Sequence, residues 1–207
     1  MGDFYEQPKP PRDIPHLMVP ELRKRLHWND PHEWRVNNWI EPWDWQSQFD
    51  VGLISVPSSK TSILANGAYG APNSIKESWA INTTYTPDYD VDLAELKVRE
   101  IGDVATPVLD LRQGIVDIEE SLRGIFTQPE SFLPIIIGGD HAITAPAVRA
   151  FCKANPDKQV GLIHFDATTM FASSITVRRM GRRSGGSLRR AFACQARTWS
   201  RSASTAS

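Results

Sequence analysis

At 207 residues, the chain is long enough for one domain with a substantial core, and its length does not demand two domains. Hydrophobic residues make up 41% and charged residues 23%, which excludes a chain that is disordered throughout. The sequence has no apolar run long enough to span a membrane, and its acidic, Pro-rich N-terminus lacks the apolar core of a signal peptide. We therefore expect a cytoplasmic protein with no membrane partner.

Charge divides the chain unevenly. Residues 168–207 hold eight of the 23 basic residues, all of them Arg, and none of the 24 acidic residues. A composition break of this kind is typical of a tail or a boundary. We expect three segments: a Pro/Trp-rich arm over residues 1–48, a folded domain over residues 49–167, and a disordered Arg/Ser-rich tail over residues 168–207.

The first segment has poor periodicity, and its tryptophans stand between charged and amide residues. A tryptophan cluster can stack bases or sugars, but this pattern favours an arm that packs on the domain or on a neighbouring subunit. The residues concerned are Trp28, Trp34, Trp39, Trp43 and Trp45.

From residue 49 onward, strands and helices alternate. Near-continuous apolar runs predict strands in FDVGLISVP, around Val98–Ile101, in SFLPIIIGG and in QVGLIHFDA. Apolar spacings of three and four predict a helix over residues 114–126, and ITAPAVRAFCKANP predicts another. This order indicates a parallel sheet covered on both faces, so we predict an α/β fold with three layers.

A long loop rich in small residues, SSKTSILANGAYGAP, follows the first of these strands. Long loops of this kind are often functional. Gly67, Gly70 and Pro72 suit a sharp turn into a helix that has Pro72 at its first position. The alternative is a turn and a helix start with no further role.

Polar side chains end two successive strands of the predicted sheet. IIIGGDH ends in Asp140 and His141, and GLIHFD ends in Asp166. A right-handed crossover through one helix makes these strands parallel, so their carboxyl ends meet at the edge where ligands bind. The pair Gly138 and Gly139 allows a tight turn before the polar residues. Imidazole and carboxylate suit Mn, Fe or Zn, although a buried His and Asp that satisfy loop backbone groups remain an equal alternative.

These motifs resemble a known family. NGAYGAP, IIIGGDHAIT and GLIHFDA, in this order, resemble the ureohydrolases, the binuclear manganese hydrolases that include arginase, agmatinase and formimidoylglutamase. The resemblance covers residues 49–167. It implies an arginase-like fold, a homo-oligomer and two Mn²⁺ ions per subunit, with His141 and Asp166 as metal ligands.

The resemblance ends after Ala167. Thr168 and Met170 occupy the positions of the family's next two ligands, and its later Asp-x-Asp pair is absent. One nucleotide lost after the Ala167 codon explains the break, because restoring it allows the next codons to read Ala-His-His-Asp-Val-Arg. That string resembles formimidoylglutamases and agmatinase-like members more than arginases. We therefore expect the tail to be out of frame and the fold to be incomplete at its C-terminus.

The resemblance implies a manganese-dependent hydrolase of C–N bonds in small linear amidines. Formimidoylglutamase fits best: it converts N-formimidoyl-L-glutamate and water into L-glutamate and formamide, a step of histidine degradation. The alternative within the family is an agmatinase- or arginase-type guanidino hydrolase. Asn66, Gly67 and Tyr69 lie on the loop at the same strand-end edge and are candidate substrate-binding residues, while no catalytic residue is assigned. With two of the family's six ligands, the chain itself is expected to be inactive and poorly soluble.

An alternative from a different functional class treats the Arg/Ser-rich tail as a genuine part of the protein. In this alternative, the protein is a non-catalytic interaction module. The guanidinium groups of its basic tail bind nucleic acid, and the affinity depends strongly on salt concentration. Since the tail lacks Lys and its apolar residues follow no regular spacing, we expect any such binding to be accidental. The sequence identifies neither the exact substrate nor the oligomeric state.

Overall fold

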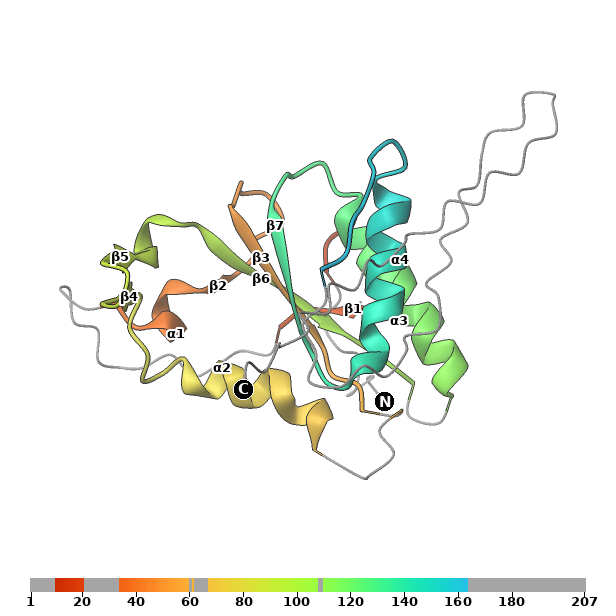
Figure 1. The fold of residues 1–207 in the computed structure, drawn as a ribbon, viewed down its shortest axis with the longest axis horizontal. Helices are drawn as coiled ribbons and strands as arrows, with labels where there is room; N and C mark the ends of the chain where they lie inside the picture. Colours follow the sequence, from red (N-terminus) through yellow and green to blue (C-terminus); the bar gives the residue numbers. More distant parts are fainter. Residues whose placement is uncertain (1–9, 21–33, 60, 62–66, 108–109, 164–207) are drawn as a thin grey trace, which may run out of the picture.

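The computed structural model describes residues 10–20, 34–59, 61, 67–107 and 110–163 (Figure 1). Within these ranges the central element is a mainly parallel sheet in the order β1-β6-β3-β7, with β2 also paired to β6. β3 is parallel to both β6 and β7, whereas β1 is antiparallel to β6. The strands are β1 (Leu17–Met18), β2 (Glu41–Pro42), β3 (Val51–Val56), β6 (Val98–Val104) and β7 (Leu133–Gly138).

Helices connect these strands, and a small hairpin lies beside the sheet (Figure 1). The α-helices are α1 (Val36–Trp39), α2 (Ala71–Ser78), α3 (Leu111–Phe126) and α4 (Thr144–Ala154). The 3-10 turns are η1 (Ala68–Gly70), η2 (Leu93–Glu95) and η3 (His141–Ile143), and the hairpin consists of β4 (Tyr85–Thr86) and β5 (Val91–Asp92). None of the helices in the described ranges has the length and apolar character needed to cross a bilayer.

Both faces of β3 are buried, and alternate residues of this strand point to opposite sides of the sheet. Ile54 and Val56 of β3 pack in the larger core with α3 and α4. Val51 and Leu53 belong to a second, smaller core, against which Trp79 at the end of α2 packs. The predicted α/β fold with a parallel sheet is confirmed. The predicted strands in residues 49–57, 98–101 and 131–139 and the two predicted helices are also confirmed, and α2 begins one residue before Pro72.

The structure corrects the sequence prediction for residues 159–163. QVGLIHFDA was expected to form a strand, but this described part of it forms none, and Ile163 is 82% exposed. A strand exists only where its backbone pairs with a neighbour. Among the described residues, β7 pairs only with β3, and its Leu133 and Ile135 side chains are exposed. The rest of the predicted strand lies outside the described residues.

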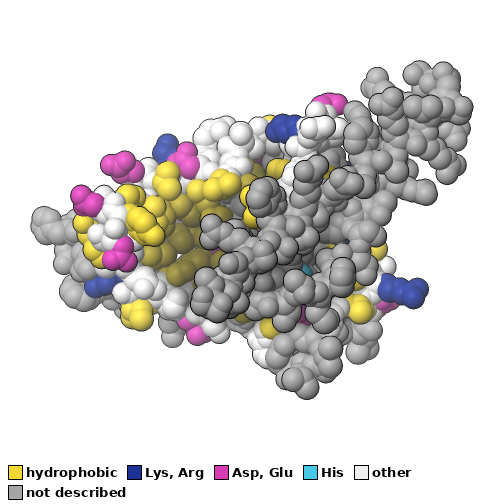
Figure 2. Space-filling model, in the orientation of Figure 1, with side chains coloured by type: hydrophobic (Ala, Val, Ile, Leu, Met, Phe, Trp, Pro, Cys, Tyr) yellow, Lys and Arg dark blue, Asp and Glu magenta, His cyan; other side chains and the backbone are white. Residues whose placement is uncertain are grey.

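Exposed apolar side chains occur on β7 and on the β4–β5 hairpin. Figure 2 shows an apolar area on the side of the molecule where β4 and β5 lie in Figure 1. The exposed large hydrophobic residues of β4, β5, β7 and the adjoining η2 segment are Tyr85, Val91, Leu93, Leu96, Leu133 and Ile135. Exposed apolar patches can mark aggregation sites, and the poor solubility expected from the sequence stays a prediction.

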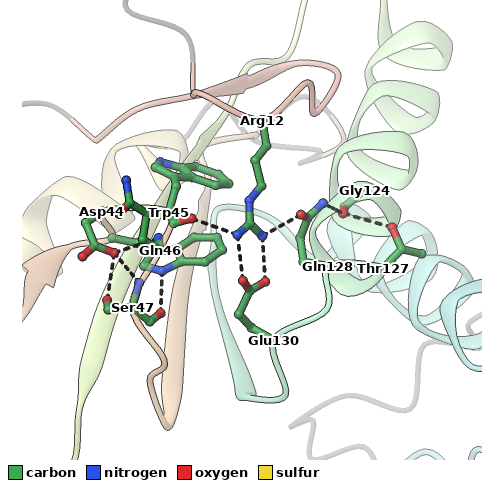
Figure 3. A network of polar contacts seen from close by, with 10 residues as sticks. Arg12, Asp44, Trp45, Gln46, Ser47, Gly124, Thr127, Gln128 and Glu130 are labelled. Carbon is green, nitrogen blue, oxygen red and sulfur yellow. Dashed lines mark hydrogen bonds and ion pairs between the residues drawn. The ribbon is translucent and has the colours of Figure 1, made fainter.

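The described part of the Trp-rich arm packs on the sheet. Trp43 and Trp45 are 4% and 6% exposed, and their ring centroids lie 4.4 Å apart. Arg12 stacks over Trp43, with 4.8 Å from its guanidinium carbon to the ring centroid. Arg12 also donates two hydrogen bonds of 2.7 Å to the Glu130 carboxylate and one each to Gln128 and the Trp45 carbonyl (Figure 3). One side chain therefore joins the arm to the segment that follows α3.

A second ion-pair group joins the two helices of one face. Glu119 of α3 accepts hydrogen bonds from Arg149 and Lys153 of α4. Burial raises the pKa of Glu119, but the hydrogen bonds from Lys153 and Arg149 outweigh burial, so this pKa lies below its ordinary value. These ion pairs hold α3 and α4 together.

We expect Arg12→Met to lower the free energy of unfolding by about 1–3 kcal/mol, because it removes charged hydrogen bonds to a carboxylate that is 6% exposed. Denaturant unfolding followed by tryptophan fluorescence measures this change. The exposed Arg112→Met on α3 is the matched control and should change stability little. Equal effects of the two substitutions would contradict the assigned role of Arg12.

This effect should depend on pH. The hydrogen bond from Arg12 holds the pKa of Glu130 below its ordinary value. A lowered folded-state pKa stabilises the fold above the unfolded-state pKa of about 4.3, and the stabilisation is lost as the pH falls through the folded-state value. The difference in stability between the unchanged chain and Arg12→Met should therefore shrink from pH 7 towards pH values below about 4. A difference that grows on acidification would be inconsistent with this pairing.

Candidate active site

The candidate site lies where the neighbouring parallel strands β3 and β7 end. Their last paired residues are Val56 and Gly138. Beyond this pair the two chains stay together, because the Asp140 amide donates a 2.7 Å hydrogen bond to the Ser58 carbonyl. At Gly139, a Cβ atom would lie 1.8 Å from that same carbonyl oxygen. The sequence predicts a tight turn here, and the structure shows that the close approach of two backbones is what requires glycine.

Asp140 holds this turn together. Its carboxylate is buried, and one oxygen accepts hydrogen bonds from the Thr61 amide at 2.7 Å and the Thr61 hydroxyl at 2.9 Å. The other oxygen accepts from the Ala142 amide at 3.2 Å and caps η3. Asp140 therefore satisfies loop backbone groups, as the alternative reading of the sequence proposed for a buried Asp.

His141 has a different environment. It opens η3 directly after Asp140 and is exposed. Its Nδ1 lies 3.1 Å from the Thr144 hydroxyl, in a contact whose donor depends on the tautomer of the ring. The imidazole therefore stands at the carboxyl edge of the sheet, at the end of β7, where the sequence places it.

The other predicted site residues divide into two groups. Gly67 and Tyr69 are exposed at η1, on the connection from β3 to α2. Asn66 and Asp166 lie outside the described residues, so the proximity of Asp166 to His141 stays a prediction. The substrate-binding role of Gly67 and Tyr69 also stays a prediction.

The described residues do not form a metal centre by themselves. No group of three or more His, Cys, Asp or Glu side chains that could hold a metal ion occurs within the described ranges. Asp140, the carboxylate nearest to His141 in the chain, is engaged by Thr61 and Ala142. These ranges thus supply one candidate ligand, His141, and a binuclear site does not fit them without residues from outside the ranges.

A buried charge cluster near this edge was not predicted. Lys76 of α2 lies 2.6 Å from Glu100 and 2.8 Å from Asp103, both on β6. The Lys76 and Glu100 side chains are 7% and 1% exposed. Buried ions of this kind are tolerated when they are paired, and removing one partner is costly. The cluster fixes α2, and with it η1, against the sheet; a Glu in the middle of an otherwise buried strand was the signal in the sequence.

Comparison with known proteins identifies the family. The sequence profile of the Arginase family matches residues 49–192, so the chain belongs to the Arginase family. A formimidoylglutamase from Halalkalibacterium halodurans is 36% identical over 138 residues, which cover 67% of this chain and 43% of that protein. An agmatinase from Pyrococcus horikoshii is 33% identical over 100 residues, which cover 48% of this chain and 35% of that protein. The predicted ureohydrolase resemblance is confirmed.

Solved structures agree with this fold. Formimidoylglutamase from Bacillus subtilis has a TM-score of 0.58 at 24% identity, over 65% of this chain and 43% of that one. A putative agmatinase from Clostridium difficile has a TM-score of 0.52 at 26% identity, over 62% of this chain and 46% of that one. The chain spans less than half the length of these relatives. Ureohydrolases of the Arginase family hydrolyse C–N bonds in amidines and guanidines.

We expect Gly139→Ala to destabilise the chain by about 1–3 kcal/mol or more, because the added Cβ meets the backbone of Ser58, which cannot rotate away. The matched control is Gly161→Ala, whose Cβ would meet nothing within 4 Å. Thermal unfolding of the two variants measures the difference. Similar melting temperatures would show that the ends of β3 and β7 are farther apart than the structure places them.

Proposed function

We propose that the protein to which this chain corresponds is a formimidoylglutamase, which hydrolyses N-formimidoyl-L-glutamate to L-glutamate and formamide. The observation that carries the proposal is the Gly-Gly-Asp-His turn at the carboxyl edge of the sheet, with His141 exposed and Asp140 holding the turn. The 36% identity to a formimidoylglutamase supports this substrate class. An agmatinase is the second candidate, supported by the 33% identity to a protein of that name.

Two Mn²⁺ ions belong to this proposal through the family resemblance. When bound, such ions would supply Lewis-acid chemistry for activating a water molecule. His141 is the ligand proposed among the described residues, and Asp166 is the ligand proposed outside them. In this proposal the other described side chains do not bind metal. Asp140 orients the turn that carries His141, and Tyr69 lies on the loop at the same edge. A homo-oligomeric state and a cytoplasmic location also remain parts of the proposal.

We further propose that the chain leaves its reading frame after Ala167. The support is the loss of the metal-ligand pattern at Thr168 and Met170, together with the all-Arg basic composition of residues 168–207. Sequencing the coding DNA across codons 165–172 tests the proposal. An intact gene in this frame would overturn it and would favour an in-frame tail, which the family match through residue 192 also allows.

We expect the 207-residue chain supplied with Mn²⁺ to show negligible turnover of N-formimidoyl-L-glutamate or agmatine, because it retains two of the family's six ligands. The frame-restored protein should hydrolyse N-formimidoyl-L-glutamate and retain about two Mn per subunit by elemental analysis. Substituting His141 with Asn in the restored protein is the control and should lower both values.

The outcomes separate the candidate functions. Turnover of agmatine alone by the restored protein would replace formimidoylglutamase with agmatinase. No metal and no turnover, together with salt-dependent nucleic-acid binding by the 207-residue chain, would favour a non-catalytic module with a basic tail. Turnover by the 207-residue chain itself would overturn the frameshift proposal.

A further inference from the structure

The contact between Thr61 and Asp140 joins two segments that are 79 residues apart in the chain. Thr61 follows β3, on the long connection that leads to η1 and α2, and Asp140 follows β7. β3 and β7 are direct neighbours in the sheet. The contact therefore lies just beyond the carboxyl ends of two parallel strands, beside the candidate ligand His141.

The Asp140 carboxylate is held from both sides. Thr61 provides two donors to one oxygen and Ala142 provides one donor to the other, and the side chain is 9% exposed. A buried carboxylate needs such donors, because an unsatisfied buried charge is costly. Three hydrogen bonds leave it little freedom to reorient.

His141 lies between two fixed backbone points. On one side, the Asp140 amide is bonded to the Ser58 carbonyl, and Gly139 has no space for a side chain. On the other side, the Ala142 amide is bonded to the Asp140 carboxylate. The Cα position of His141 is therefore determined by how Asp140 is held, although Asp140 and His141 do not need to touch.

We infer that Thr61 and Asp140 are a pair of positioning residues for His141. Asp140 acts as the rigid support of the His141 turn, and Thr61 fixes Asp140 by donating its hydroxyl to the carboxylate. The inference rests on the proposed function for the importance of His141, but the contact itself is tested without any catalytic measurement. Thr61 is β-branched, so its χ1 is restricted and its hydroxyl is aimed at low entropic cost.

The experiment measures amide hydrogen exchange by NMR in the 207-residue chain. Thr61→Val keeps the shape of the side chain and removes the hydroxyl, so exchange at Ala142 should become about tenfold faster, the effect expected for one lost hydrogen bond to a charged group. Exchange at Leu122 and Ile125 in the α3 core should not change. Thr61→Ser retains the hydroxyl and should restore the slow exchange at Ala142.

Two further variants complete the experiment. Asp140→Asn keeps the shape, removes the negative charge and replaces one acceptor oxygen with a donor. One hydrogen-bond partner then loses its acceptor and the other keeps only a neutral one, so exchange should become faster at both Thr61 and Ala142. Thr86→Val in β4, distant in the fold, is the control and should leave Ala142 unchanged.

Unchanged exchange at Ala142 in Thr61→Val would overturn the inference. An equal acceleration at Ala142 and Leu122 would also overturn it, because the effect would then be general destabilisation. Fast exchange at Ala142 in Thr61→Ser would also overturn the inference. In the frame-restored protein, Thr61→Val should lower kcat more than it raises KM; absence of all turnover there contradicts the proposed function and leaves the exchange result standing.

Discussion

The close approach of the chain after β3 to the chain after β7 is the constraint on which the candidate site depends. Two adjacent parallel strands end together at Val56 and Gly138, and the Asp140 amide then bonds to the Ser58 carbonyl. This approach is possible because Gly139 has no Cβ. Once the two backbones are this close, the Asp140 carboxylate lies within reach of Thr61, and the position of His141 at the edge of the sheet follows.

The charged groups of the described residues are mostly used for structure. Arg12 joins the arm to Glu130, Lys76 joins α2 to β6, and Glu119 joins α3 to α4. In the turn after Trp43, Asp44 accepts hydrogen bonds from the Ser47 and Gln46 amides, and these lower its pKa to about 2. Hydrogen bonds of this kind stabilise the charged form of Asp44.

The sequence predicts the local elements well because their signals are local. The apolar run of β3 and the three-and-four spacing in α3 depend on residues close together in the chain, and both elements form as predicted. The sequence offered a loop-stabilising role for Asp140 as an alternative, but its partner Thr61 was not predictable, since it lies 79 residues away. The same limit applies to Lys76, whose buried partners lie on β6.

For the segment after α4, the sequence pattern and the structure give different results. Its residues have the composition of a buried strand, yet residues 159–163 form none, because a strand needs a paired neighbour and a covered face. The exposed Leu133 and Ile135 side chains of β7 lie in register with Val51 and Leu53, on a face of the sheet that is uncovered at β7 among the described residues. The chain spans less than half the length of the relatives compared above. The described residues therefore do not include those that would cover this face in a full-length family member. The proposed metal site depends on pairing of this segment with β7, because that pairing would bring Asp166 to the edge where His141 stands.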